Sequence, residues 1–239
     1  MDTNLTVPWT PYIPHKPTPK QLAFLMLDIP EALYGGAAGG GKSDALLMAA
    51  LQYVDTPNYS ALLLRKTYAD LALPGALMSR AIEWLSPTDA KWKGSGKEWV
   101  FPSGATITFG YLDTEHSHYR YQSSEFQFIG FDELTQFRDV QYRYLFSRLR
   151  RLENQSIPLR MRSASNPGGI GHEWVRERFV DRDPEETDRI FIPATLADNP
   201  HLDRETYLNS LSQLDPLTRQ QLLHGDWTAR QAGGMFQRE

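Results

Sequence analysis

The sequence contains no cysteine in its 239 residues. This absence excludes a disulfide and a metal site built from thiolates. Apolar runs are also short, and none approaches the roughly 20 residues of a membrane-spanning helix, so we expect no membrane partner. Positive charge is not in excess, because 25 Lys and Arg residues stand against 29 Asp and Glu, for a net charge of -4. Any nucleic-acid contact must therefore come from a local basic surface.

The composition is otherwise that of an ordinary globular protein, with 41% hydrophobic and 23% charged residues. The length suits one large domain, or one domain with a small appendage. Prolines at positions 8, 11, 14 and 17 predict an extended N-terminal arm. Apolar strand candidates separated by helical patterns predict an α/β fold with a central, mainly parallel sheet flanked by helices.

A glycine-rich stretch from Gly36 to Ser43 matches the P-loop pattern, in which G-x-x-x-x-G is followed by Lys and Ser or Thr. Glycines allow the tight turn in which successive N–H groups face phosphate oxygens. Lys42 can reach the β- and γ-phosphates of a nucleotide, and the Ser43 hydroxyl can ligate Mg²⁺. A chance glycine-rich turn is the alternative. The context favours the P-loop, because a strand-like pair at 33–34 precedes it and a helical pattern over 44–53 follows it.

An almost continuously apolar strand candidate at 126–131 ends in Asp132 and Glu133. Two acids after one strand are a weak signal alone, because any strand can end in charge. Paired with the P-loop upstream, they indicate a Walker B motif. Asp132 would then hold Mg²⁺ through water, and Glu133 would polarise the attacking water.

Three further positions each have two interpretations. Gln21 either completes a capping box with Thr18 at the start of a helix expected to run to about Asp28, or reads adenine through its amide. Arg65 follows a strand candidate at 59–64, where it is either part of a site or an exposed cation. Ser165 and Asn166 follow a strand candidate at 158–163, where they either sense a γ-phosphate or form a plain turn.

The most basic segment lies between 138 and 162. Its arginines are Arg138, Arg143, Arg148, Arg150, Arg151, Arg160 and Arg162. Aromatic residues are interleaved with them. The segment either contacts a phosphate backbone or a neighbouring subunit, or forms a solvated helix face.

The remaining elements follow from local patterns. We expect helices at 77–85 and 171–180, a hairpin over 99–109 that turns at 102–104, and a strand at 189–192. Residues 203–223 are expected to be helical with a break near Asp215 and Pro216, and a glycine-containing tail follows at 231–236.

Together these residues resemble the N-terminal ATPase domain of the large terminase subunit of tailed bacteriophages. The resemblance runs from about Thr18 to Phe236. It rests on an ordered set of motifs at 17–21, 33–43, 63–67, 128–137, 165–169 and 224–227. The P-loop alone is shared with many ATPases, but the ordered set is much more specific.

The resemblance implies a motor that hydrolyses ATP with Mg²⁺ to move double-stranded DNA into an empty capsid. Such subunits form a homo-oligomeric ring, usually a pentamer, at the portal in the host cytoplasm. Their partners are DNA, the portal protein and the small terminase subunit; alone, we expect a monomer. The fold implied is a RecA-like (ASCE) P-loop NTPase with an arm at 1–17, a core at 18–200 and a small helical lid with a linker at 201–239.

By the same resemblance, Glu133 is the catalytic carboxylate, and Ser43 and Asp132 serve the metal. Ser165 and Asn166 match the motif that couples hydrolysis to movement. The predicted nucleotide-binding residues are Gln21, Gly36, Ala37, Ala38, Gly39, Gly40, Gly41, Lys42, Ser43 and Asn166.

Two departures from the family pattern matter. Family members usually continue into a nuclease domain, and the chain stops at Glu239, so we expect the ATPase part without DNA cleavage. Many members also have an Arg-Gly pair before the Walker B strand, where this sequence has Gln122 and Ser123. Arg120 is therefore the first candidate for a catalytic arginine supplied to a neighbouring subunit. Arg138 and Arg143 follow.

Two other functions remain as alternatives. One is a helicase-like P-loop ATPase, which needs a second RecA-like domain that this length cannot hold. The other is a nucleotide-dependent DNA-binding switch, which would not need a placed carboxylate such as Glu133.

Overall fold

The computed structural model describes residues 10–153 and 156–229. A single eight-stranded sheet forms the centre, in the order β3-β4-β5-β2-β6-β7-β1-β8. The strands are β1 Glu31–Gly36, β2 Ser60–Arg65, β3 Lys91–Lys93, β4 Glu98–Val100, β5 Thr106–Tyr111, β6 Phe128–Asp132, β7 Arg160–Ser165 and β8 Arg189–Ala194. Strands β5, β2, β6, β7, β1 and β8 run parallel, and β3 and β4 are antiparallel at one edge. The predicted α/β fold with a mainly parallel sheet is confirmed.

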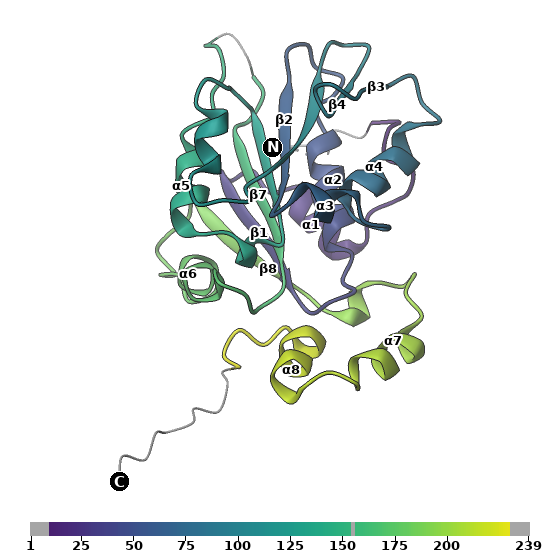
Figure 1. The fold of residues 1–239 in the computed structure, drawn as a ribbon, viewed down its shortest axis with the longest axis vertical. Helices are drawn as coiled ribbons and strands as arrows, with labels where there is room; N and C mark the ends of the chain where they lie inside the picture. Colours follow the sequence, from purple (N-terminus) through teal and green to yellow (C-terminus); the bar gives the residue numbers. More distant parts are fainter. Residues whose placement is uncertain (1–9, 154–155, 230–239) are drawn as a thin grey trace, which may run out of the picture.

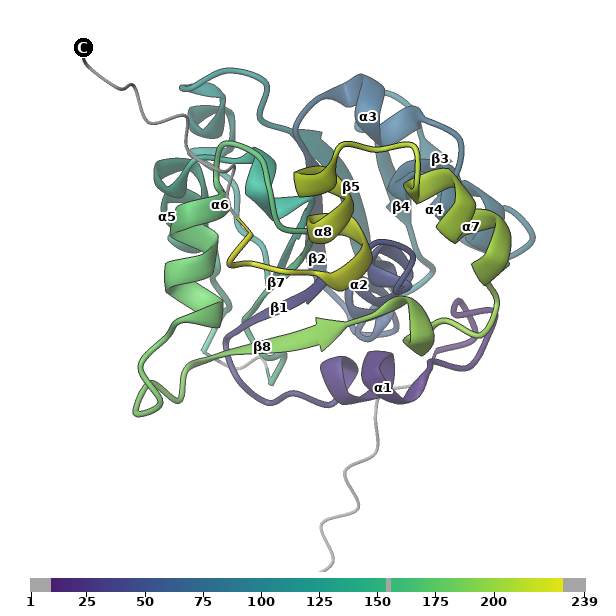
Figure 2. The same cartoon turned by 90° about the horizontal axis from the view of Figure 1, so that it is seen from below.

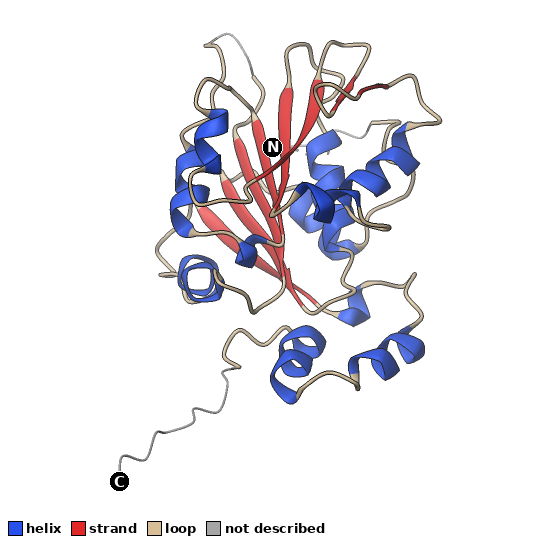
Figure 3. Cartoon of the chain, viewed as in Figure 1, coloured by secondary structure: helices blue, strands red, loops and turns tan. Residues whose placement is uncertain are grey.

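Helices cover both faces of the sheet (Figures 1 and 3). One face carries α1 Pro19–Leu25, α2 Lys42–Leu51, α3 Tyr68–Ala72 and α4 Leu77–Leu85. The other carries α5 Asp139–Phe146 and α6 His172–Val175, which continues as a π-helical turn, Arg176–Val180. Two more helices, α7 Arg204–Leu211 and α8 Pro216–His224, lie across the ends of the strands (Figure 2). Because both faces are covered, β1 and β6 are buried along their whole length.

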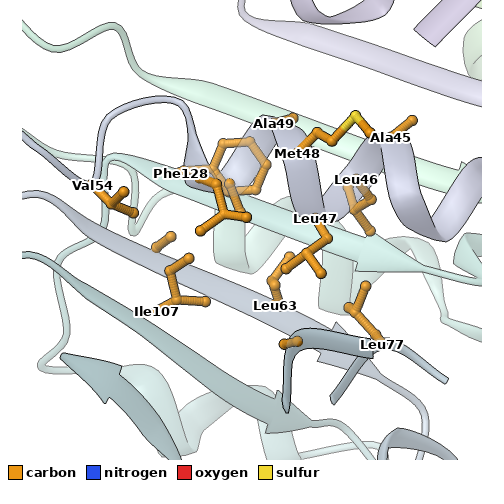
Figure 4. Close-up of a cluster of buried hydrophobic side chains, with 14 of the residues drawn as sticks. Ala45, Leu46, Leu47, Met48, Ala49, Val54, Leu63, Leu77, Ile107 and Phe128 are labelled. Atoms are coloured by element: carbon orange, nitrogen blue, oxygen red, sulfur yellow. The ribbon is translucent and has the colours of Figure 1, made fainter. Parts of the chain in front are cut away.

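Helix α2 packs closest to the sheet, and its apolar residues after Asp44 are all buried (Figure 4). They meet Leu63, Ile107 and Phe128 from three neighbouring strands. Gly130 on β6 permits this approach, because a Cβ there would lie 2.6 Å from Leu63 Cδ2 and 3.2 Å from Leu46 Cδ1. The sheet thus holds α2, and with it the loop that precedes α2, in one position.

Most predicted elements are confirmed, with shifted ends. The helix at Leu77–Leu85 and the hairpin of β4 and β5 are as expected. The entry helix ends at Leu25 rather than near Asp28, and β6 and β7 each begin two residues late. Sequence patterns missed β3 and α3. The expected tail at 231–236 and the first nine residues of the arm lie outside the described residues. The rest of the arm buries Tyr12 and Ile13 in the core.

Two of the arginines expected on the basic surface are buried instead: Arg160 and Arg162 on β7 are 8% and 1% exposed. Arg162 donates to the carbonyl oxygens of Leu27 at 3.0 Å and Pro30 at 3.2 Å. Arg160 donates to Gln52 Oε1 at 3.1 Å. Burial, reinforced by the charge of Arg160, lowers the pKa of Arg162 to about 9. These two side chains hold the sheet to its connecting segments and offer nothing to DNA.

A buried ion pair joins β1 to the second helical layer. Arg178 Nη2 lies 2.8 Å from Glu31 Oε2, and Arg178 Nε also donates to Glu31. The Tyr142 hydroxyl donates to Glu31 Oε1 at 3.0 Å. The Glu31 side chain is only 2% exposed, so salt screens this pair much less than it screens an exposed one.

Glu31→Gln should lower the free energy of unfolding by about 3 kcal/mol, because it leaves the Arg178 charge buried without a counter-charge. Arg143→Ala is the control: its pair with Asp139 is exposed at 63% and 38%, and its loss should cost less than about 0.5 kcal/mol. Urea denaturation measures both. Equal losses would show that the buried pair contributes no more than the exposed one.

Candidate nucleotide-binding site

The loop from Gly36 to Ser43 leaves β1 and enters α2 with Gly36, Gly39 and Gly41 at positive φ. The Lys42 ammonium lies within the loop and donates to the Ala37 carbonyl oxygen at 2.7 Å. Burial lowers the pKa of Lys42, while the carboxylates of Glu133 and Asp132 oppose that shift. The loop is therefore a folded cradle with a buried cation at its centre.

Two contiguous cavities open beside this loop. One, of about 360 Å³, is lined by residues 38–44 together with Glu133 and Asn166. The other, of about 450 Å³, is lined by Thr18, Gln21 and Trp84 among others. Both share Gly40 and Gly41 as a wall. The smaller cavity has an ammonium group, loop glycines and a carboxylate, which suit the phosphates of a nucleotide. The larger cavity has an indole ring and an amide, which suit a nucleobase.

Asp132 ends β6, and Glu133, which follows it, lines the phosphate-sized cavity. Asp132 Oδ1 accepts a hydrogen bond from Ser43 Oγ at 3.3 Å, and Asp132 Oδ2 accepts one from Arg65 Nε at 2.7 Å. Arg65 Nη2 lies 3.8 Å from Glu133 Oε1, and the Arg65 side chain is only 16% exposed. Burial alone would lower the pKa of Arg65, but the ion pair with Asp132 outweighs it and raises that pKa. Of the two interpretations of Arg65, the exposed cation is wrong.

The oxygens of Ser43 and Asp132 fit Mg²⁺, which prefers few protein oxygens and completes its shell with water and phosphate. Among the described residues no group of three or more His, Asp or Glu side chains gathers as a metal site.

Glu133 has a left-handed backbone, with φ 57° and ψ 57°, which costs free energy for a residue other than glycine. Burial and the neighbouring Asp132 raise the pKa of Glu133, while Lys42, Arg65 and a backbone hydrogen bond from Asn166 act in the opposite direction. The side chain is 24% exposed and lines the phosphate-sized cavity. A strained, partly dry carboxylate at such a place is typical of a functional group.

Strand β7 lies between β1 and β6 in the sheet, so its end reaches between the loop and the two acids. Ser165 Oγ accepts from Thr135 N at 3.1 Å and lies 3.0 Å from Thr135 Oγ1. Asn166 lines the phosphate-sized cavity, and its Oδ1 is buried with no hydrogen-bond partner among the described residues. The chain also turns here, with Gly168 and Gly169 at positive φ. The turn and a sensing role for Asn166 are therefore compatible.

The capping box at Gln21 is confirmed, because Gln21 Oε1 accepts from Thr18 N at 2.9 Å. The other end of the amide, Nε2, donates to the Gly41 carbonyl oxygen at 2.9 Å. Gln21 thus holds α1 against the loop and also lines the larger cavity. Its reading of adenine stays a prediction.

Arg120 lies in a 3-10 turn, Ser117–Tyr121, outside both cavities. Its Nη2 is 3.5 Å from Asp113 Oδ1, and its guanidinium carbon is 4.5 Å from the centre of the Tyr111 ring. The side chain is 46% exposed. The site within this chain therefore does not contain Arg120, and its proposed role concerns a neighbouring copy.

Sequence reasoning missed several residues that contact the loop. Arg80 on α4 and His15 in the arm line the cavity walls and both contact Asp44. The sequence signal for these two residues was Asp44, because a carboxylate directly after Ser43 needs cationic partners. Asn199 Nδ2 donates to the Gly39 carbonyl oxygen at 2.7 Å, and no local pattern indicates this contact.

The C-terminal helices also reach the loop (Figure 2). The Ala38 N–H donates to the Leu222 carbonyl oxygen of α8 at 2.7 Å. Gly225 ends α8 at φ +63°, and a Cβ there would lie 2.5 Å from Ala37 N and 2.6 Å from Gly36 Cα. The end of α8 therefore rests directly on the backbone of the loop.

The fold and the site define a P-loop nucleotide-binding domain. The family described as "Terminase large subunit, T4likevirus-type, N-terminal" matches residues 33–239, and the chain belongs to that family. The expected kinship with phage large terminases is thereby confirmed. A comparison with curated protein sequences finds no match.

Solved structures agree with this fold. The large terminase of a thermophilic bacteriophage has a TM-score of 0.70 at 14% identity, over 89% of this chain and 54% of that one. The complex of the same terminase with ATP-gamma-S gives a TM-score of 0.69 at 16% identity, over 89% and 53%. The ATPase domain of the Thermus phage P74-26 large terminase gives 0.64 at 12% identity, over 90% and 96%. The chain thus spans about half the length of the first of these terminases.

Gly225→Ala should lower the affinity for ADP about tenfold and the free energy of unfolding by about 2 kcal/mol, because its Cβ meets the loop backbone and its φ is left-handed. Gly104→Ala is the matched control, with φ +85° and nothing within 4 Å of the added Cβ. It should cost about 1 kcal/mol through its φ alone and leave ADP binding unchanged. Unfolding curves and ADP titrations measure both. Equal ADP affinities would show that α8 does not support the loop.

Proposed function

We propose that this domain hydrolyses ATP and that hydrolysis drives double-stranded DNA into a viral procapsid. The observation that carries the proposal is that the loop after β1 and the ends of β6 and β7 each place a side chain at one cavity. Lys42 after β1, Glu133 after β6 and Asn166 after β7 all line the same space of about 360 Å³. Phosphoryl transfer to water needs a cation that binds phosphate and a carboxylate that orients the water, and here an amide lies beside both.

The proposed roles follow from position. Gly36 to Ser43 and Lys42 hold the phosphates, the larger cavity beside Gln21 holds the base, and Asn166 contacts the terminal phosphate. Glu133 orients the attacking water and accepts its proton. Bound Mg²⁺, held by Ser43 and by Asp132 through water, would neutralise charge on the phosphate oxygens.

Partners are proposed from the family. They are double-stranded DNA, the portal protein, the small terminase subunit and further copies of this chain in a ring. Support for the DNA contact is local: four arginines of the basic segment are exposed, Arg138, Arg143, Arg150 and Arg151. Arg150 N donates to the Phe126 carbonyl oxygen beside the beginning of β6. Arg150 therefore lies at the opposite end of β6 from Asp132 and Glu133.

We propose a core at 18–200 and a helical lid with a linker at 201–239; the described helices of that lid, α7 and α8, lie across the ends of the strands (Figures 1 and 2). DNA cleavage is not part of the proposal.

Glu133→Gln should retain ATP binding and lose hydrolysis by a factor on the order of 10²–10⁴, because an amide of the same shape cannot accept a proton. Lys42→Ala should instead lose binding, because the charge-assisted contact to phosphate is removed. Binding is measured with a fluorescent ATP analogue and turnover by phosphate release. Normal turnover by Glu133→Gln would overturn the role of Glu133, and normal turnover by Lys42→Ala would overturn the site.

A neighbouring subunit should complete the site through Arg120, since an arginine supplied in trans is worth about 10³–10⁵ in rate. Specific ATPase activity should then rise with protein concentration, and Arg120→Ala should abolish that rise without changing ATP affinity.

Mixing Arg120→Ala with Glu133→Gln should restore activity, because some interfaces in mixed assemblies pair an intact Glu133 with an intact Arg120. Arg138→Ala and Arg143→Ala are tested in the same mixtures, because these two arginines are the next candidates for the one supplied in trans. A mixture no more active than its two components would assign the missing charge to an arginine of the same chain, with Arg65 the first to test.

A further inference from the structure

Arg80 on α4 stands where the two cavities meet. It lines the phosphate-sized cavity beside Ser43, and it lines the larger cavity beside Gln21 and Trp84. The side chain is 32% exposed, so the cavity can reach it. No motif in the sequence includes this residue.

The partners of Arg80 leave most of its donors free. Its Nη1 lies 2.5 Å from Asp44 Oδ1, and Asp44 Oδ2 lies 3.4 Å from His15 Nε2. Its Nε is buried and has no hydrogen-bond partner among the described residues. A guanidinium offers five N–H donors in a planar fork that matches phosphate oxygens. A single ion pair with Asp44 does not use that capacity.

Asp44 explains why an arginine is held here. It follows Ser43 in the first turn of α2, where backbone N–H groups and the helix dipole favour an anion. A carboxylate at that place repels phosphate unless it is balanced. Burial raises the pKa of Asp44, whereas Arg80 and His15 act to lower it. Arg80 therefore either balances Asp44 only, or also binds the nucleotide itself.

We propose that Arg80 binds the α-phosphate of the nucleotide. This rests on the proposed function. The P-loop takes the β- and γ-phosphates in one cavity, and the other cavity takes the base. The parts of a nucleotide that join them are the ribose and the α-phosphate, so the α-phosphate passes the wall that Arg80 forms. Other arginines are placed differently: Arg65 is paired with Asp132, and Arg120 lies outside the cavities.

A double-mutant cycle separates the two roles. The dissociation constant of a fluorescent ADP analogue is measured for the wild type and for Arg80→Ala, Asp44→Asn and the double variant. Asp44→Asn removes the charge that Arg80 balances, so it also protects the double variant from an unpaired buried carboxylate. We expect Arg80→Ala to weaken binding about tenfold in both backgrounds, because a phosphate contact is lost in each. Arg80→Lys, which keeps the charge without the fork, should fall between.

Equal dissociation constants for Asp44→Asn and the double variant would overturn the proposal and leave Arg80 as a partner of Asp44. Loss of affinity should be the same for ADP and for ATP-γ-S, since both carry the α-phosphate; a loss confined to ATP-γ-S would move the contact to the γ-phosphate and also overturn it. Ile82→Ala, an exposed position on α4, should bind as the wild type. If the wild type binds no ADP, the proposed function fails. If the wild type binds ADP and Lys42→Ala does not, the nucleotide site stands, and the cycle then tests only the role of Arg80.

Discussion

Six parallel strands end at one edge of the sheet, and the candidate site follows from that constraint. A parallel sheet brings groups that are far apart in the chain to neighbouring strand ends. Arg65 at the end of β2, Asp132 at the end of β6 and Asn166 just after β7 meet for this reason. The close packing of α2 on the same sheet then places Ser43 beside Asp132. Without the common strand direction, none of these side chains would face the others.

The charges at this edge balance one another before any ligand is considered. Asp132 and Glu133 lie next to each other and would repel. Lys42 and Arg65 lie against them, and each cation acts on the pKa of Glu133 in the direction opposite to burial. A site of this kind can exchange one cation–carboxylate contact for another without leaving a buried charge alone.

The sequence predicted those parts of the site whose signal is local. The loop at 36–43 has a fixed spacing, and the acids at 132 and 133 follow an apolar run, so both could be found without the fold. Arg162 could not, because its burial depends on the carbonyl oxygens of Leu27 and Pro30, which only the folded sheet brings near it. Arg80 could not be predicted either, because its proposed role depends on its position where two cavities meet and not on its neighbours in sequence.

The hydrogen bond between Ala38 N–H and the Leu222 carbonyl oxygen has a thermodynamic consequence. It connects the nucleotide loop with a helix near the other end of the chain. Linkage is reciprocal: if occupancy of the loop changes the free energy of this contact, a load that displaces α8 changes nucleotide affinity by the same factor. Tension applied to the chain beyond Gly225 would therefore change the nucleotide affinity of the loop as an allosteric ligand does, without binding to a site.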